Sequence, residues 1–174
     1  MSWFDRPGKA LKSALLLAPL ALAGCIQPLY GPLGVGGGID RELQAIEVAP
    51  IEKRTGHYLA EELIFGFNGS REPVPPKYKL VVSLSERVQT PIQDTVTARA
   101  TAATLINDAT FILYPAAGGA PLFQGTAFSA AGYDRFSQRI SNVQGARNAE
   151  QRNARVVADL IKQQISNYLA GRAS

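Results

Sequence analysis

Cysteine and histidine are almost absent from this chain of 174 residues, which contains one of each, Cys25 and His57. A single cysteine cannot form an internal disulfide, so the folded domain must be held together by packing, even in an oxidising compartment. It also excludes a cysteine-rich zinc site, and a single histidine excludes a metal cluster with several histidine ligands. We therefore predict no metal site and no cofactor.

The usual signatures of catalysis are missing as well. The chain has no Gly-x-Ser-x-Gly elbow, and His57 is the only imidazole that could serve as a general base. Glu61 and Glu62 are adjacent on a predicted helix, where neighbouring side chains point away from each other, so they do not form an acid/base pair. We interpret His57 as a surface residue at the start of that helix and predict that the protein is not an enzyme. If it were a hydrolase, a His57→Ala variant would lose the activity.

A large excess of one charge is also lacking. The whole chain has a net charge of +4, but residues 1–24 contain three basic side chains and one acidic one. The remaining 150 residues hold 15 basic and 13 acidic side chains, which is a net charge of +2. Such a small excess is a weak argument for nucleic-acid binding, and we predict none. A length of 150 residues fits a single domain.

The one long apolar run, from Ser13 to Ala23, follows the basic residues Arg6, Lys9 and Lys12 and is too short to span a bilayer as a stable helix. This layout is typical of a secretory signal. The run ends in Leu22-Ala23-Gly24-Cys25, which resembles the lipobox of bacterial lipoproteins. The alternative is an ordinary signal peptide followed by a chance cysteine.

The lipobox resemblance implies that residues 1–24 are a signal peptide, that the chain is cut before Cys25, and that acyl chains are attached to Cys25. Two or more acyl chains anchor a protein stably, at about 0.8 kcal/mol per buried methylene. Ile26 stands where an Asp would favour the inner membrane in enterobacterial lipoproteins. The resemblance therefore implies the periplasmic side of the outer membrane.

Proline and glycine dominate the next stretch, residues 25–38, which shows no apolar periodicity. We predict a flexible tether here and a single domain over residues 39–174. A phosphate-binding loop would need a Gly-Lys-Ser/Thr ending, which is missing. Ile39 also stands where the third glycine of a dinucleotide-binding motif would fall.

Within the domain, alternation predicts a first strand over Leu43 to Val48, which Pro50 ends. A helix follows, with Thr55 as its N-cap and Asn68-Gly69 at its end. The clearest strand alternates from Tyr78 to Leu84 and runs on toward Val88. It turns within residues 90–95.

Three further elements complete the domain. A third strand is weakly patterned over residues 97–104 and stronger over 105–114, where Leu105, Ala109, Phe111 and Leu113 share one face. After a hairpin loop at residues 115–121, a fourth strand begins at Leu122 and fades through residues 130–132. A long helix runs from Ser141 to about Leu169, and Gly171 closes it. We expect its basic residues Arg147, Arg152, Arg155 and Lys162 to lie on a solvated face.

This order of elements predicts the fold class. Consecutive strands without intervening helices form an antiparallel meander. We predict an α+β domain in which two helices pack on one face of a four-stranded, largely antiparallel sheet, as a two-layer sandwich.

Three features together resemble the LptE family of alphaproteobacteria, the lipopolysaccharide-assembly lipoproteins. They are the Cys-x-x-Pro-Leu-Tyr-Gly start (Cys25 to Gly31), the order of strands and helices, and Tyr133-Asp134 leading into an Ala- and Arg-rich helix. The resemblance implies a lipoprotein partner of LptD, the outer-membrane β-barrel, that sits partly in the barrel lumen as a plug and helps lipopolysaccharide to cross. The alternative is an accessory lipoprotein of a lipid ABC transporter in the periplasm.

Two parts of the sequence fit such a role. A sheet end with small and polar residues suits a polar barrel lumen, although such residues are also common at solvent-exposed strand ends (Thr95, Thr97, Ala98, Ala100, Thr101, Ala102, Ala103, Thr104). Lipopolysaccharide carries phosphates and acids that call for cationic partners. Basic residues near predicted turns are our hypothesis for that contact, and the alternative for each is an ordinary solubilising arginine (Arg87, Arg99, Arg135, Arg139).

Overall fold

The computed structural model describes residues 37–69, 74–90 and 101–173. The predicted signal peptide, Cys25 and residues 25–36 of the predicted tether lie outside these ranges. The elements, in chain order, are α2 (Gly37–Gln44), β1 (Ile46–Val48), α3 (Lys53–Asn68), β2 (Tyr78–Gln89), β3 (Ala102–Pro115), β4 (Phe123–Asp134) and α4 (Arg139–Ala173).

The four strands form one mixed, mostly antiparallel sheet in the order β1-β2-β3-β4. The strands β2, β3 and β4 make the predicted antiparallel meander, with Leu80 opposite Leu113 and Leu113 opposite Phe123. The short strand β1 pairs in parallel with the start of β2, from Ile46 opposite Tyr78 to Val48 opposite Leu80. The strand β2 and the second half of β3 alternate as their sequence pattern predicted, with Leu80, Phe111 and Leu113 on the buried face.

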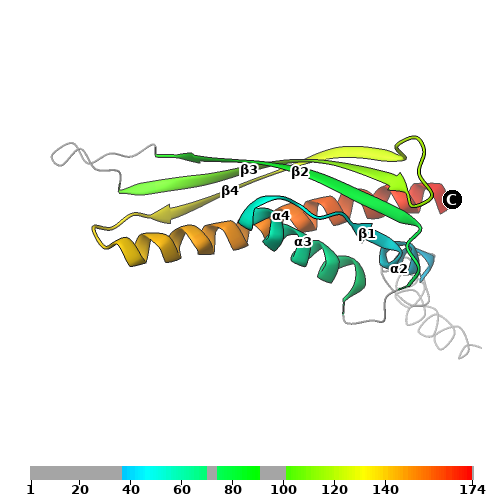
Figure 1. Cartoon of the computed structure of the whole chain (residues 1–174), viewed down its shortest axis with the longest axis horizontal. Helices are drawn as coiled ribbons and strands as arrows, with labels where there is room; N and C mark the ends of the chain where they lie inside the picture. The colour runs from blue at the N-terminus through cyan, green and yellow to red at the C-terminus, as the bar shows by residue number, and fades with distance from the viewer. Residues whose placement is uncertain (1–36, 70–73, 91–100, 174) are drawn as a thin grey trace, which may run out of the picture. The chain divides into compact units, whose positions relative to one another are not determined.

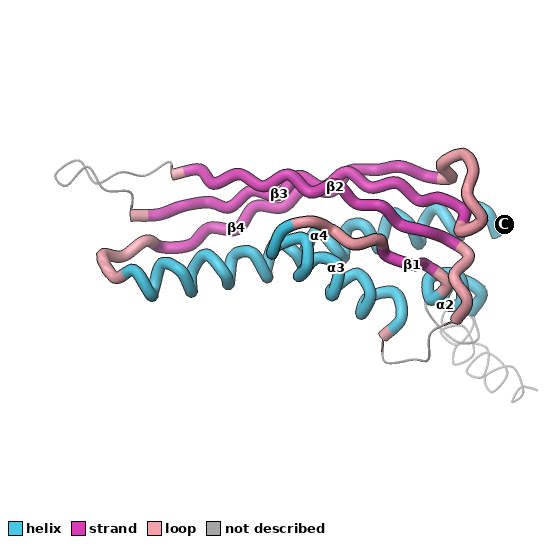
Figure 2. The backbone as a smooth tube through the Cα atoms, viewed as in Figure 1, coloured by secondary structure: helices cyan, strands magenta, loops and turns pink. Residues whose placement is uncertain are grey.

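The helices α3 and α4 lie on the same side of the sheet, and α4 follows the sheet along its length (Figure 1, Figure 2). With 35 residues, α4 is about 52 Å long. The predicted α+β class, with two main helices packed against one sheet, is confirmed.

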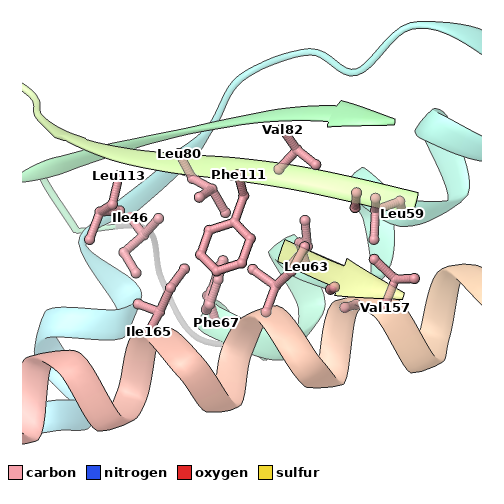
Figure 3. Close-up of a cluster of buried hydrophobic side chains, with 14 of the residues drawn as sticks. Ile46, Leu59, Leu63, Phe67, Leu80, Val82, Phe111, Leu113, Val157 and Ile165 are labelled. Atoms are coloured by element: carbon pink, nitrogen blue, oxygen red, sulfur yellow. The ribbon is translucent and has the colours of Figure 1, made fainter. Parts of the chain in front are cut away.

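The apolar core fills the space between the sheet and the two helices (Figure 3). The ring of Phe111 lies in its middle and is completely buried, and side chains from α3 and α4 surround it, including Leu63, Phe67 and Ile165. These side chains recur at helical spacing on α3 and α4, so burial of one face of each helix holds the two layers together.

The first strand was predicted too long. Leu43 and Gln44 belong to α2, which begins at Gly37, and only Ile46–Val48 is extended. Ile39 and Leu43 are four residues apart and both buried, which is the spacing of one helical face. The alternation seen in the sequence combined the end of this helix with the strand that follows.

Several other boundaries also differ from the prediction. Thr55 is not the N-cap of α3, because the helix begins two residues earlier and Glu52 holds the cap position without a side-chain hydrogen bond. The end of α3 is confirmed at Gly69, where φ is +60° and the Gly69 N–H donates to the Phe65 carbonyl at 2.7 Å. The long helix α4 starts at Arg139 and continues through Gly171, and β4 does not fade but remains paired to Asp134.

Candidate functional site

Two of the four arginines proposed for lipopolysaccharide contact come together at the β4–α4 turn. Arg135 directly follows β4, and Arg139 is the first residue of α4. Both are exposed, and neither has an ion-pair partner among the described residues. Figure 1 shows this turn at the opposite end of the sheet from α2 and the C-terminus. Free guanidinium groups at an exposed turn are available to bind an anionic group from outside.

The other two arginines do not join this pair. Arg87 lies on the face of β2 that turns away from the helices, where its Nη1 is 2.5 Å from Asp108 Oδ2 of β3. Because Arg87 is already paired with Asp108, its guanidinium group is less available to an anionic ligand. Arg99 lies outside the described residues.

Hydrogen bonds hold the β4–α4 turn in one conformation. The Arg135 N–H donates to the Thr101 carbonyl at 2.9 Å, which extends the β3–β4 ladder by one step. The side chain of Asn142 accepts from the Phe136 N–H at 2.6 Å and donates to the Phe136 carbonyl at 2.8 Å. Both arginines therefore project from a fixed backbone.

Exposed apolar side chains accompany the two arginines, and their exposure is seen only in the structure. Phe136 and Val143 are exposed, and Ile140 is 78% exposed. Ile140 directly follows Arg139, and Phe136 directly follows Arg135, within a stretch that is otherwise polar. The sequence signal that could have indicated this group is an apolar residue directly after each arginine at the predicted turn. We call this group of five residues the tip (Arg135, Phe136, Arg139, Ile140, Val143).

The tip has the chemistry of a surface that binds an anionic amphiphile. Its guanidinium groups can form charge-assisted hydrogen bonds to phosphate or carboxylate oxygens. Its apolar side chains are exposed to solvent, and they can pack against the hydrocarbon part of a ligand. The start of β3 nearby is built from small residues, Ala102 to Thr104, as the sequence suggested for this sheet end, and residues 95–100 lie outside the described ranges.

A buried polar layer lies between the sheet and the two helices. Glu86, Asn107 and Ser129 are register partners on β2, β3 and β4. Thr55 donates to Glu86 Oε2 at 2.5 Å, and Ser129 donates to Asn153 Oδ1 at 2.8 Å. The apolar rows that contain Ala109 and Leu105 flank this layer on either side.

Asn107 is the exception within that layer. It is 0% exposed, and neither its side-chain oxygen nor its side-chain nitrogen has a hydrogen-bond partner among the described residues. Asn153, by contrast, also donates to the Leu105 carbonyl at 2.9 Å. A buried amide without partners costs free energy, so Asn107 is a weak point of the layer.

Most of the remaining predicted surface residues are exposed, but Lys162, expected on the solvated face of the long helix, is half-buried. His57 is exposed, and its Nε2 is 3.1 Å from Glu61 Oε1. Glu62 turns instead to Arg155, whose Nη2 is 3.1 Å from Glu62 Oε1. Arg155 and Arg152 are exposed on α4, although Arg152 also donates to the Gly132 carbonyl. The described residues contain no group of three or more side chains that could hold a metal ion.

None of the described helices is long and apolar enough to cross a membrane. No protein-family model matches the sequence, and no curated protein matches it.

The fold has counterparts among solved structures. One is a candidate lipoprotein of Caulobacter crescentus CB15, with 25% identity and a TM-score of 0.65 over 78% of this chain and 97% of that one. Another is rare lipoprotein B of Shewanella oneidensis, with 14% identity and a TM-score of 0.52 over 74% of this chain and 97% of that one. The chain is therefore similar in fold, over most of its length, to proteins described as bacterial lipoproteins.

Proposed function

We propose that the protein is a non-enzymatic outer-membrane lipoprotein that partners an LptD-type β-barrel in lipopolysaccharide transport and insertion, and that its tip contacts lipopolysaccharide. The observation that carries this proposal is the tip itself, where Arg135 and Arg139, which have no ion-pair partner in the described part of the chain, lie beside exposed apolar side chains. Lipopolysaccharide combines phosphates with hydrocarbon, and the tip offers a partner for each. The similarity in fold to rare lipoprotein B (LptE) supports the same assignment.

The proposed domain organisation follows from the sequence. Residues 1–24 are removed, Cys25 carries the acyl chains, and residues 25–38 connect the anchor to the domain. Eleven residues lie between Cys25 and Gly37, the first residue of α2, so the two can be at most about 40 Å apart. The anchor thus confines the domain to the membrane surface that holds the proposed barrel partner. A Cys25→Ala variant should be mislocalised but folded, and loss of the fold in that variant would contradict a tether role.

Lipopolysaccharide binding tests the tip directly. We expect the double variant Arg135→Ala with Arg139→Ala to bind purified lipopolysaccharide about tenfold more weakly, since two charge-assisted contacts are lost. A matched control is Lys79→Ala with Arg172→Ala, which removes the same charge from exposed positions far along the chain from the tip. Equal losses in the two variants would reduce the effect to net charge, and unchanged binding in the first would remove the tip from the mechanism. The quadruple variant that adds Arg87→Ala and Arg99→Ala tests the full set.

The partner is tested separately, by purification of the acylated protein from native membranes. Stoichiometric recovery of a large outer-membrane barrel is expected. Recovery of an inner-membrane transporter complex would instead identify an accessory lipoprotein of a lipid ABC transporter. This result does not depend on the tip, so the two parts of the proposal can fail independently.

A further inference from the structure

Within the part of the chain that the structure describes, one edge of the sheet is largely unpaired. β2 pairs with β3 along its whole length, from Tyr78 to Gln89. On its other edge it pairs with β1 only from Tyr78 to Leu80. The Ala49 N–H then donates to the Leu80 carbonyl at 2.9 Å, and no described residue makes a backbone hydrogen bond to this edge beyond that point.

The backbone groups on this edge can be identified from the ladder. The Leu80 carbonyl points toward β1, so alternate residues of the strand point the same way. The N–H and C=O groups of Val82, Leu84, Glu86 and Val88 therefore face the open edge. From Val82 to Val88 this edge is about 20 Å long, which is room for a strand of about six residues.

The opposite edge of the sheet is treated differently. On β4, the side chain of Gln164 donates to the Thr126 carbonyl at 2.9 Å, and that of Arg152 donates to the Gly132 carbonyl at 2.8 Å. Both side chains come from α4. Side chains of α4 thus satisfy two outward carbonyls of β4, whereas no described residue bonds to the outward carbonyls of β2 beyond Leu80.

The open part of β2 carries few of the devices that protect an edge, because its two charged side chains, Glu86 and Arg87, are already bonded to Thr55 and Asp108. Residues 81–89 contain no proline and no lysine, and the pairing with β3 runs without a bulge. Proteins commonly use these devices to prevent strand addition. The outward-facing side chains Ser83 and Ser85 are small, so they leave the backbone accessible.

A groove runs beside the first part of this edge. It has a volume of about 410 Å³ and is lined by residues 50–53 of the β1–α3 connection and residues 82–84 of β2. Pro50 turns the chain out of the sheet and, having no N–H, cannot continue the ladder. Ile51 and Leu84 are half-buried in the groove wall, which makes part of the lining apolar.

We infer that the edge of β2 from Val82 to Val88 is a strand-addition site for an extended segment of another protein, in which apolar and polar residues alternate. The occupant is indicated by continuity with β1, which already fills the first part of the same edge in this manner. In β1, Ile46 is buried toward the helices and Glu47 is exposed. A segment that continues this row places its apolar side chains toward Ile51 and Leu84 and its polar side chains beside Ser83 and Ser85. Main-chain hydrogen bonds supply the affinity. The inference depends neither on the lipid anchor nor on the tip.

The test uses a peptide and the full chain carrying Cys25→Ala, so that no acyl chain is attached. The probe is an acetylated octapeptide, Ile-Glu-Val-Lys-Ile-Glu-Val-Lys, which repeats the alternation of β1. We expect it to slow amide hydrogen exchange about tenfold at Val82, Leu84, Glu86 and Val88, measured by NMR, because these N–H groups become hydrogen-bonded. The amides of β4 should not change. The same peptide N-methylated at its two central residues lacks a donor on each edge and should not bind.

A protein variant tests the same edge from the other side. Val88→Pro removes an N–H that faces the open edge, at a half-exposed position, and keeps the ladder to β3. We expect it to weaken peptide binding about tenfold, whereas Val88→Ala should bind like the parent protein. If Val88→Pro does not fold, the N-methylated peptide still decides the question.

Three results would overturn the inference. The first is no binding of the unmodified peptide. The second is binding that survives N-methylation or that maps to the amides of β4. The third is a dimer in sedimentation experiments without peptide, with the four β2 amides already protected, because a second copy would then be the occupant.

Discussion

Arg54 of α3 holds the buried carboxylate of Glu150 of α4 through two hydrogen bonds. Arg54 Nε lies 2.8 Å from Glu150 Oε2, and Nη2 lies 2.5 Å from Oε1. The Glu150 side chain is 7% exposed, whereas that of Arg54 is 56% exposed. The hydrogen bonds and the charge of Glu150 raise the pKa of Arg54 above its ordinary value. The pair joins residues that are 96 positions apart in sequence and links the two helices beside the polar layer.

We expect Arg54→Ala to lower the free energy of unfolding by about 2 kcal/mol, because it leaves a buried carboxylate without its partner. Loss of a fully buried partner would cost more, but water can reach the half-exposed position of Arg54. The double variant with Glu150→Gln should cost less than the sum of the single variants, since no charge is then stranded. Urea denaturation of the four proteins measures the coupling. Additive losses would show that the ion pair contributes nothing of its own.

The second prediction concerns acid. Glu42 accepts from Lys77 Nζ at 2.6 Å and from the Tyr78 hydroxyl at 2.7 Å, and these contacts lower the pKa of Glu42 below its ordinary value. A lowered pKa means that the ionised carboxylate stabilises the folded state above the pKa of the unfolded chain. That stabilisation is lost as the pH falls through the pKa of the folded state.

We therefore expect the free energy of unfolding to fall more steeply between about pH 6 and pH 3 in the parent protein than in Glu42→Gln. Tyr78→Phe removes one of the two donors, so it should give an intermediate slope. Urea titrations at a series of pH values measure all three. Identical slopes would contradict a role for Glu42 in acid stability.

The sheet and the position of its helices could be predicted because their signals are local. Strict alternation in β2 and in the second half of β3 identifies the buried face residue by residue. The absence of a helix between these strands and β4 leaves an antiparallel meander as the simplest topology. Burial of Leu80, Phe111 and Leu113 on one face agrees with that pattern.

Other features depend on contacts between distant residues and left no local signal. The parallel pairing of β1 with β2 joins segments on either side of α3 in the sequence. No local pattern marks that pairing, so the predicted first strand combines Ile46–Val48 with the end of the helix before it. Thr55 looked like an N-cap because threonine favours that position, but its hydroxyl is used by Glu86, 31 residues later. At the tip, the sequence indicated the arginines, whereas the exposure of Ile140 required the structure.

The third prediction concerns the unpaired amide of Asn107. Asn107→Leu replaces it with an apolar side chain of similar size between the apolar rows of β3. We expect the free energy of unfolding of this variant to be about 1 kcal/mol higher than that of the parent protein, because the cost of a buried, unsatisfied amide disappears. Chemical denaturation measures the difference.

Asn153 provides the control for that experiment, because it is buried to the same degree but its amide is hydrogen-bonded to Ser129 and Leu105. We expect Asn153→Leu to destabilise the protein by about 2 kcal/mol. Destabilisation of both variants by equal amounts would mean that Asn107 has a partner in solution, such as a buried water molecule.

The last prediction concerns close packing between β4 and the core. A Cβ atom at Gly125 would lie 2.6 Å from Phe111 Cζ and 2.6 Å from Gln164 Oε1. Gln164 could move, but the Phe111 ring is completely buried and also contacts Phe123 at a centroid distance of 5.9 Å. We therefore expect Gly125→Ala to lower the free energy of unfolding by about 2 kcal/mol through overpacking.

Gly132→Ala, on the same strand, is the control for this prediction. Its Cβ would lie 4.0 Å from the nearest atom, the Ala103 carbonyl oxygen. That substitution should be neutral or stabilising by about 0.5 kcal/mol, since alanine reduces the entropy of the unfolded chain. Equal stability of the two variants in urea denaturation would show that the core accommodates a methyl group beside Phe111.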